Sequence, residues 1–266
     1  MSARARLSII LFLAGFAGVL SFQLVDLAAL ISMLPEAAGK EMPLPMAVVR
    51  ILSVVQPAAF VGAAVFVGVM LSPKVGLSAP AAESLASGRS FFPALKPQIV
   101  PGLIGGVIGG VAVIASWVLW RPFLPPQFAS KAEGFNQILP PITRLLYGGI
   151  TEEVLLRWGL MTFLVWAGWK VFQRGRGNPG TSAFIMAIIL SSVVFGIGHL
   201  PLAVGLNGGV AALSLITYVV VANSAFGLIA GYLYWSRGLE SAIVAHMTTH
   251  GVILTGLSLL PSLDRA

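Results

Sequence analysis

The sequence predicts an all-α integral membrane protein, a polytopic bundle of about seven (six to eight) transmembrane helices. Its composition is the first observation: 57% of the 266 residues are hydrophobic and 9% are charged, whereas soluble domains carry about 25% charged residues. The second observation is that the apolar residues gather in seven runs, most of them long enough to cross a bilayer. A soluble enzyme and a disordered chain are both excluded.

Each apolar run has recognisable ends. The first follows the basic start MSARAR, is about 28 residues long and contains Asp26, so it is a retained helix and not a signal peptide. The fourth begins near Pro141, because proline suits a first helical turn, and the basic segment KVFQRGRGNPG ends it. The predicted spans are Leu7–Leu34, Val48–Leu71, Ile99–Trp120, Pro141–Phe172, Thr181–His199, Gly209–Trp235 and Leu239–Leu260.

Two proline-bearing segments flank the third span. Ser72–Gln98 is expected to be a loop with a short surface helix, and residues 121–142 are expected to be a second loop. Within the third span, Gly105-Gly106 and Gly109-Gly110 should let neighbouring helices approach closely.

The net charge of +7 is explained by membrane topology rather than by nucleic-acid binding. With the N-terminus inside, nine cations lie in inner loops and six in outer segments, which mildly favours that orientation. The nine are Arg4, Arg6, Lys74, Arg89, Lys96, Lys170, Arg174, Arg176 and Arg237; the six are Lys40, Arg50, Arg121, Lys131, Arg144 and Arg265.

Ionisable residues inside membrane helices are costly, about 2.5–3.5 kcal/mol each, and therefore mark the places to look for function. Asp26 and Arg50 are isolated in the sequence and are expected to have a structural role, as a pair between the first two helices. Glu240 stands at a helix start, where a carboxylate suits the helix dipole. We expect it to act as a cap.

The fourth span contains the segment ITEEVLLRWGL. Glu153 and Arg157 are four residues apart, so on an α-helix they share a face and can form an ion pair. Glu152 is turned about 100° away from Glu153. Either this is a buried ion network that fixes helix packing, or one acid is neutralised and the other is free for chemistry.

All three histidines lie on predicted spans. His199 ends the segment FGIGH, and His246 and His250 stack one turn apart on the seventh span. Two such imidazoles can bind one metal ion or one oxyanion, or they can simply hydrogen-bond between helices. The zinc-protease pattern H-E-x-x-H fails, because Met247 follows His246. No cysteine is present, which excludes a thiol nucleophile and a cysteine metal site.

These groups together favour hydrolysis of an amide. A glutamate would take a proton from water, and the imidazoles would bind a metal ion or the developing oxyanion. The order of the motifs EEVLLR, FGIGH and HMTTH resembles the CAAX protease and bacteriocin-processing family of intramembrane proteases, which includes abortive-infection proteins. That family has E-E-x-x-x-R, F-x-x-x-H and H-x-x-x-N on separate helices, and the match covers about Pro141–Leu260.

The resemblance implies a helical bundle around a polar intramembrane cavity and a role for each motif residue. Glu152 would be the base that activates water, with help from His199. Glu153 would pair with Arg157 and hold the site. His246 would stabilise the oxyanion or ligate a metal, and His250 stands where the family commonly has asparagine. A divalent metal such as zinc, held by His199, His246 and His250, and a metal-free site are both open.

The predicted protein is thus an intramembrane endopeptidase in the bacterial cytoplasmic membrane. Its substrate would be a membrane-associated peptide or protein, lipidated or not, and its other partner the lipid bilayer. Residues 1–140 form transmembrane helices and loops without a motif, residues 141–260 form the catalytic core, and residues 261–266 form a short tail.

Two other interpretations remain at this stage. A non-catalytic membrane scaffold with the same fold would keep the helices without needing the motif residues. A proton- or ion-coupled transporter would also carry membrane glutamates and histidines, but the chain lacks the repeat pair that many transporters show.

Overall fold

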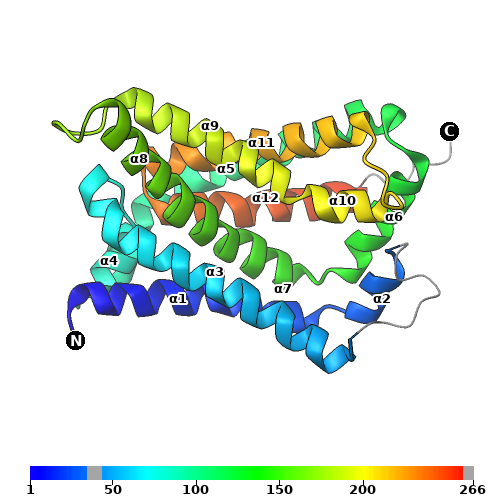
Figure 1. Cartoon of the computed structure of the whole chain (residues 1–266), viewed down its shortest axis with the longest axis horizontal. Helices are drawn as coiled ribbons and strands as arrows, with labels where there is room; N and C mark the ends of the chain where they lie inside the picture. The colour runs from blue at the N-terminus through cyan, green and yellow to red at the C-terminus, as the bar shows by residue number, and fades with distance from the viewer. Residues whose placement is uncertain (35–43, 260–266) are drawn as a thin grey trace.

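The computed structural model describes residues 1–34 and 44–259, and this part of the chain is helical with no strand. Long helices lie side by side along one axis and alternate in direction (Figure 1). In chain order the elements are α1 (Ala3–Ser21), η1 (Phe22–Leu24), α2 (Leu27–Ser32), α3 (Met46–Val75), α4 (Pro80–Ala86), α5 (Phe91–Trp120), η2 (Arg121–Phe123), α6 (Pro126–Ile138), α7 (Pro141–Thr143), η3 (Arg144–Glu152), η4 (Val154–Met161), α8 (Thr162–Phe172), α9 (Thr181–Gly198), α10 (Leu200–Leu206), α11 (Leu213–Ser236) and α12 (Leu239–Leu259).

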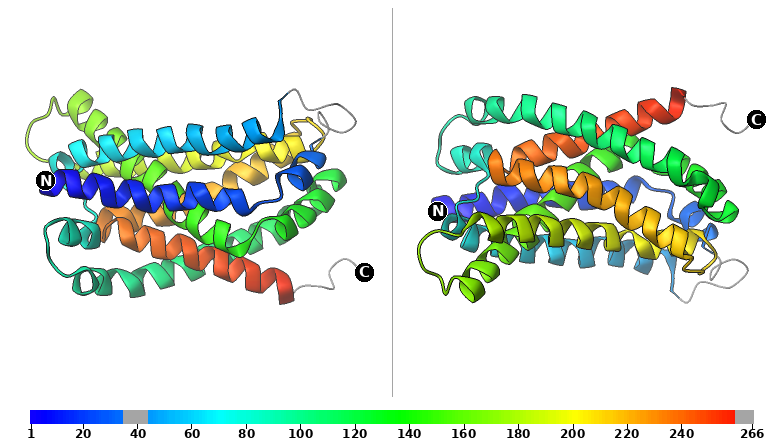
Figure 2. Two further views of the ribbon diagram at one scale, coloured as in Figure 1. Left: turned by 90° about the horizontal axis from the view of Figure 1, so that it is seen from below. Right: turned by 90° about the horizontal axis from the view of Figure 1, so that it is seen from above.

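The predicted class and the approximate number of spans are confirmed. Six segments of the described residues are long and apolar enough to cross a membrane. The seventh predicted span corresponds to α12, a 21-residue helix that runs beside α5 (Figure 2). The protein is an integral, multi-pass membrane protein.

The first span is not one continuous helix, as the sequence had suggested. The chain leaves the helical conformation at Val25, and Asp26 starts the short helix α2 by accepting a hydrogen bond from the Ala29 amide at 3.0 Å. Arg50 donates instead to the Gln23 carbonyl at 3.4 Å. The expected Asp26–Arg50 pair is therefore absent from the described structure, because Asp26 acts as a helix cap.

The loop after the second span is shorter than predicted. Helix α3 continues to Val75 and α5 already begins at Phe91, which leaves α4 between them. Helix α4 is not a surface helix, because its alanines are largely buried. Glu240 does cap a helix, but that helix is α4: its Oε1 accepts from the amides of Ala81 at 3.0 Å and Ala82 at 2.9 Å. The second predicted loop likewise contains a helix, α6.

Glycines let α5 pack tightly against α12 and α11, as predicted. A Cβ atom on Gly106 would collide with Thr248 and with the Ala245 carbonyl, and a Cβ on Gly109 would lie 2.7 Å from the Phe226 ring. Thr249 donates to the Gly106 carbonyl at 3.0 Å. This close contact fixes the position of α12, the helix that carries His246 and His250, relative to α5.

The fourth span begins and ends as predicted, but its middle is π-helical rather than α-helical. Two π segments, η3 and η4, follow the first turn of the span and continue into α8. π-Helical turns are rare and are frequent at functional sites. The acidic motif lies at the junction of these two segments.

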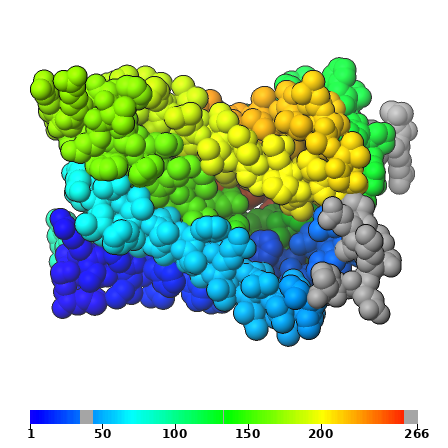
Figure 3. Space-filling view, in the orientation of Figure 1, coloured from blue at the N-terminus to red at the C-terminus, as the bar shows by residue number. Residues whose placement is uncertain are grey.

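The surface is hollowed near the middle of the bundle. Figure 3 shows this hollow between α3 and the α9–α10 segment, with atoms in the colours of the fourth span and of α12 at its floor. The hollow therefore opens toward the helices that carry the motifs.

Candidate active site

The π-helical junction turns its charged side chains to different surroundings. Glu153 and Arg157 are completely buried and form the predicted ion pair, with 3.3 Å between Glu153 Oε2 and Arg157 Nε. The Glu152 side chain keeps 20% of its surface exposed. Thr151, just before them, fixes the segment to α1 by donating to the Gly15 carbonyl at 2.7 Å.

Glu153 has a second partner that the sequence did not indicate. Its Oε1 lies 2.8 Å from His246 Nδ1, so one buried carboxylate holds both Arg157 and His246. An ionised carboxylate only accepts hydrogen bonds, so Nδ1 must carry the proton. The opposite ring nitrogen, Nε2, faces Glu152, whose Oε2 is 3.8 Å away.

Arg157 is held from three sides. Besides Glu153, it donates through Nη2 to the Gly227 carbonyl of α11 at 3.0 Å. Its Cζ lies 5.3 Å from the centre of the Phe195 ring, within the range of a cation–π contact. The arginine therefore ties the π-helical segment to α9 and α11.

His199 ends α9 and has a defined tautomer. Its Nδ1 lies 2.8 Å from the Phe195 carbonyl, which can only accept, so Nδ1 carries the proton and Nε2 has a free lone pair. The Phe195 ring lies 4.8 Å from the His199 ring and 5.8 Å from the His246 ring. His199 thus joins the cluster through Phe195.

His250 completes the row of imidazoles. Its ring stacks on His246 with 4.9 Å between centres and 13° between planes. It passes over Gly148 so closely that a Cβ there would collide with Nε2. This Nε2 is buried and has no hydrogen-bond partner within the described structure. A buried polar atom without a partner calls for an explanation, and a substrate or water group would supply one.

The six predicted residues therefore gather at one place, five of them through direct contacts. Sequence reasoning missed the partners that build their surroundings. Phe195 belongs to the motif FGIGH, but the sequence alone assigned no role to it. Gly148 lies before the acidic motif, and nothing in the sequence indicates that it contacts a histidine. Phe226 of α11, 4.4 Å from the His246 ring, lies outside all three motifs.

The three imidazoles do not fit a single metal ion as they are placed. A zinc ion needs several lone pairs converging at about 2 Å. The rings of His246 and His250 are nearly parallel and stacked, so their in-plane lone pairs do not converge. No group of three histidine or acidic side chains in the described residues is arranged to hold an ion. The predicted metal-ligand role therefore gains no support from this geometry.

The fold and this cluster define a polytopic membrane protein with a buried acid–imidazole site. Residues 134–252 match the family model described as type II CAAX prenyl endopeptidase Rce1-like. Over these residues the chain is similar to the CAAX protease family, which confirms the resemblance carried by the motifs. No match was found among curated proteins or among solved structures.

Proposed function

We propose that the protein is an intramembrane endopeptidase that hydrolyses an amide bond with Glu152 as the base and without a metal ion. The family supports a CAAX protease-like hydrolase. The observation that supports a glutamate base is that the two adjacent acids have different contacts. Glu153 is paired with Arg157 and His246, whereas Glu152 has only a longer contact of 3.8 Å with His246 Nε2 and stays partly exposed.

The proposed reaction starts when Glu152 takes one proton from a water molecule. The water oxygen forms a bond to the carbon of the scissile amide, and the carbonyl electron pair moves to its oxygen. When this intermediate collapses, the C–N bond breaks and Glu152 returns the proton to the departing nitrogen. The products are a carboxylic acid and an amine, and the glutamate is regenerated.

The imidazoles would stabilise the negative charge that develops on the carbonyl oxygen and orient the attacking water. Glu153 accepts from His246 Nδ1 and orients the ring, so that Nε2 would point to the oxyanion and donate to it once this nitrogen carries a proton. This resembles the way a buried carboxylate orients a catalytic histidine in serine proteases. His250 Nε2 is unpartnered beside it and would supply a second contact. His199 Nε2, a free acceptor, would help to orient the water.

The proposed substrate is a peptide or protein at the bilayer surface with a lipidated cysteine near its C-terminus. The family description supports this substrate class. The position of the two acids within a membrane span and the hollow on the side of the bundle support access from the membrane (Figure 3). We place the protein in a bacterial cytoplasmic membrane.

The decisive test is Glu152→Gln in the full chain, assayed with an internally quenched peptide that ends in a farnesylated CAAX sequence. Loss of the base should lower cleavage by about 10²–10⁴-fold, while the folded protein keeps its thermal stability. The matched control is Glu83→Gln, which should cleave at the normal rate because Glu83 lies at α4, outside the cluster.

Two results would contradict the proposal. If Glu152→Gln is folded and cleaves normally, the base lies elsewhere. If wild-type protein cleaves no farnesylated or unlipidated peptide, and Glu152→Gln restores the phenotype of a deletion strain, the protein is a membrane scaffold instead.

A further inference from the structure

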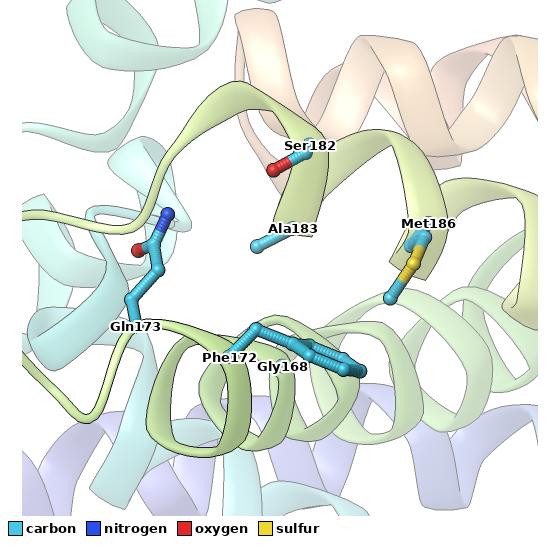
Figure 4. A pocket seen from close by; sticks show the side chains of 6 residues that line it. All are labelled: Gly168, Phe172, Gln173, Ser182, Ala183 and Met186. Carbon is cyan, nitrogen blue, oxygen red and sulfur yellow. The ribbon is translucent and has the colours of Figure 1, made fainter.

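A pocket lies far from the acidic cluster, between the last turns of α8 and the first turns of α9. Its walls are Gly168, Phe172, Gln173, Ser182, Ala183 and Met186 (Figure 4). The polar side chains, Gln173 and Ser182, lie toward the connecting loop, and Met186 lies further along α9. The pocket is thus polar at the end of the bundle and apolar toward its middle.

The last turn of α8 and the loop that follows it are strongly basic. Lys170, Arg174 and Arg176 are all exposed, and among the described residues none of them forms an ion pair with an acid. The sequence has no aspartate or glutamate between Glu153 and Glu240, so no acid from this hairpin can neutralise them. An anion would meet an uncompensated positive field here.

Aromatic residues place this hairpin at the level of the membrane surface. The Trp169 indole donates to the Arg176 carbonyl at 3.3 Å, and its ring lies 4.7 Å from Lys170 Nζ. Tryptophans are enriched where a membrane protein passes from hydrocarbon to headgroups. Beside the pocket, the exposed side chains at the end of α8 and in the first turns of α9 are apolar: Phe172 is 73% exposed and Ile185 is 48% exposed.

We propose that this pocket binds one anionic phospholipid. Arg174 and Arg176 would attract the phosphate group, Gln173 and Ser182 would contact the headgroup region, and an acyl chain would lie along Phe172 and Met186. The order of polarity along the pocket matches the order along a lipid molecule. Basic pockets between membrane helices bind acidic headgroups by this chemistry.

A free phosphate is a poorer candidate, because most of the pocket wall is apolar and would gain nothing from it. The end of the bundle that bears the pocket also bears the N-terminus (Figure 1) and the cation-rich set of nine. By the positive-inside rule this end faces the leaflet in which acidic lipids attract basic segments.

The test is native mass spectrometry of the full chain in detergent, titrated with phosphatidylglycerol or, in parallel, with phosphatidylcholine. Wild type should retain phosphatidylglycerol preferentially. The double variant Arg174→Gln/Arg176→Gln should bind phosphatidylglycerol about 30-fold more weakly, since each cation near a lipid surface contributes about a factor of five. Inorganic phosphate added at millimolar concentration should not displace the lipid.

Two further variants separate this pocket from general surface charge. Arg4→Gln/Arg6→Gln removes two cations from the same end of the bundle but from α1, and should change affinity less than about twofold. Gly168→Leu should fill the pocket and weaken binding of both lipids, because a Cβ there meets only Ala183 at 3.8 Å and is tolerated. If that variant does not fold, Phe172→Ala removes an exposed wall for the same purpose.

Equal losses in the two charge variants would mean diffuse attraction and would overturn the proposal. So would normal binding in Gly168→Leu, or displacement of the lipid by inorganic phosphate. Neither double variant touches a residue of the acidic cluster, so peptide cleavage measured in parallel keeps this proposal separate from the proposed function.

Discussion

The two halves of the chain contribute different things to the site. Every side chain of the acid–imidazole cluster comes from residues beyond 140, on the π-helical segments, α9 and α12. The helices before residue 140 contribute backbone carbonyls and the absence of side chains. Gly15 accepts a hydrogen bond from Thr151, Gly68 leaves room for the Trp158 ring, and Gly106 lets α12 come close.

The comparison shows that the first half of the chain, which carries no motif, is still constrained in sequence where its helices must approach the site closely. A functional side chain is visible in the sequence because its chemistry is unusual in a membrane. A position where a side chain must be missing is visible only when the neighbouring helix is known. We therefore expect substitutions in the first half to act through placement, and substitutions in the second half to act through charge and chemistry.

The largest effect on stability is expected for Glu153→Gln. The change leaves the buried Arg157 without its counter-charge, and breaking a buried pair in this way costs about 3–5 kcal/mol. Thermal unfolding of the purified protein measures it. The double variant Glu153→Gln/Arg157→Met should recover much of the stability but not the cleavage activity, because His246 still lacks its carboxylate. Full activity in the double variant would mean that Glu153 is only structural.

Much of the architecture could be predicted from the sequence, since hydropathy is a local property. The ends of the fourth span and the Glu153–Arg157 pair followed from prolines, basic residues and spacing. The break at Asp26 was missed because the apolar run continues through it, although the short acidic side chain is a typical helix cap.

The site was predicted as a set of residues but not as a geometry. Its π-helical backbone has no signal in the local sequence, and its two segments pack against α1 and α3, which are distant in the chain. The contact between Glu153 and His246 joins residues 93 positions apart. Spacing along one helix finds partners on that helix only, so it assigned Glu153 to Arg157 alone.

Gly18→Ala tests the first half directly. A Cβ on Gly18 would lie 2.5 Å from the Leu146 carbonyl and would collide with Thr151, so α1 must move away from η3. Overpacking of this kind typically costs about 1–3 kcal/mol, and we expect cleavage to fall with stability. Gly62→Ala is the matched control, since its Cβ would meet only Phe12 at 3.8 Å. Equal stability of the two variants would refute the idea that close approach of α1 positions the acids.

His250 offers a test that sharpens the role of the second half. His250→Asn keeps a hydrogen-bond donor beside His246 and should retain cleavage within about tenfold, whereas His250→Ala removes the donor and should cost about 10²–10³-fold. Zinc content measured on the same preparations should stay far below one ion per chain in wild type. Stoichiometric zinc that is lost in both variants would instead support the metal site predicted from the histidines.

The smallest effect is expected for Asp26→Ala, a substitution in the first half of the chain. Asp26 is an exposed cap of α2 and forms no ion pair with Arg50 in the described structure. Loss of a cap costs about 1 kcal/mol, so thermal stability should fall slightly and cleavage should stay within about twofold. Asp26→Ser, which keeps a capping oxygen, should restore the stability. If instead Asp26→Ala abolished cleavage in a stable protein, an acid of the first half would belong to the chemistry, and the contrast between the halves would fail.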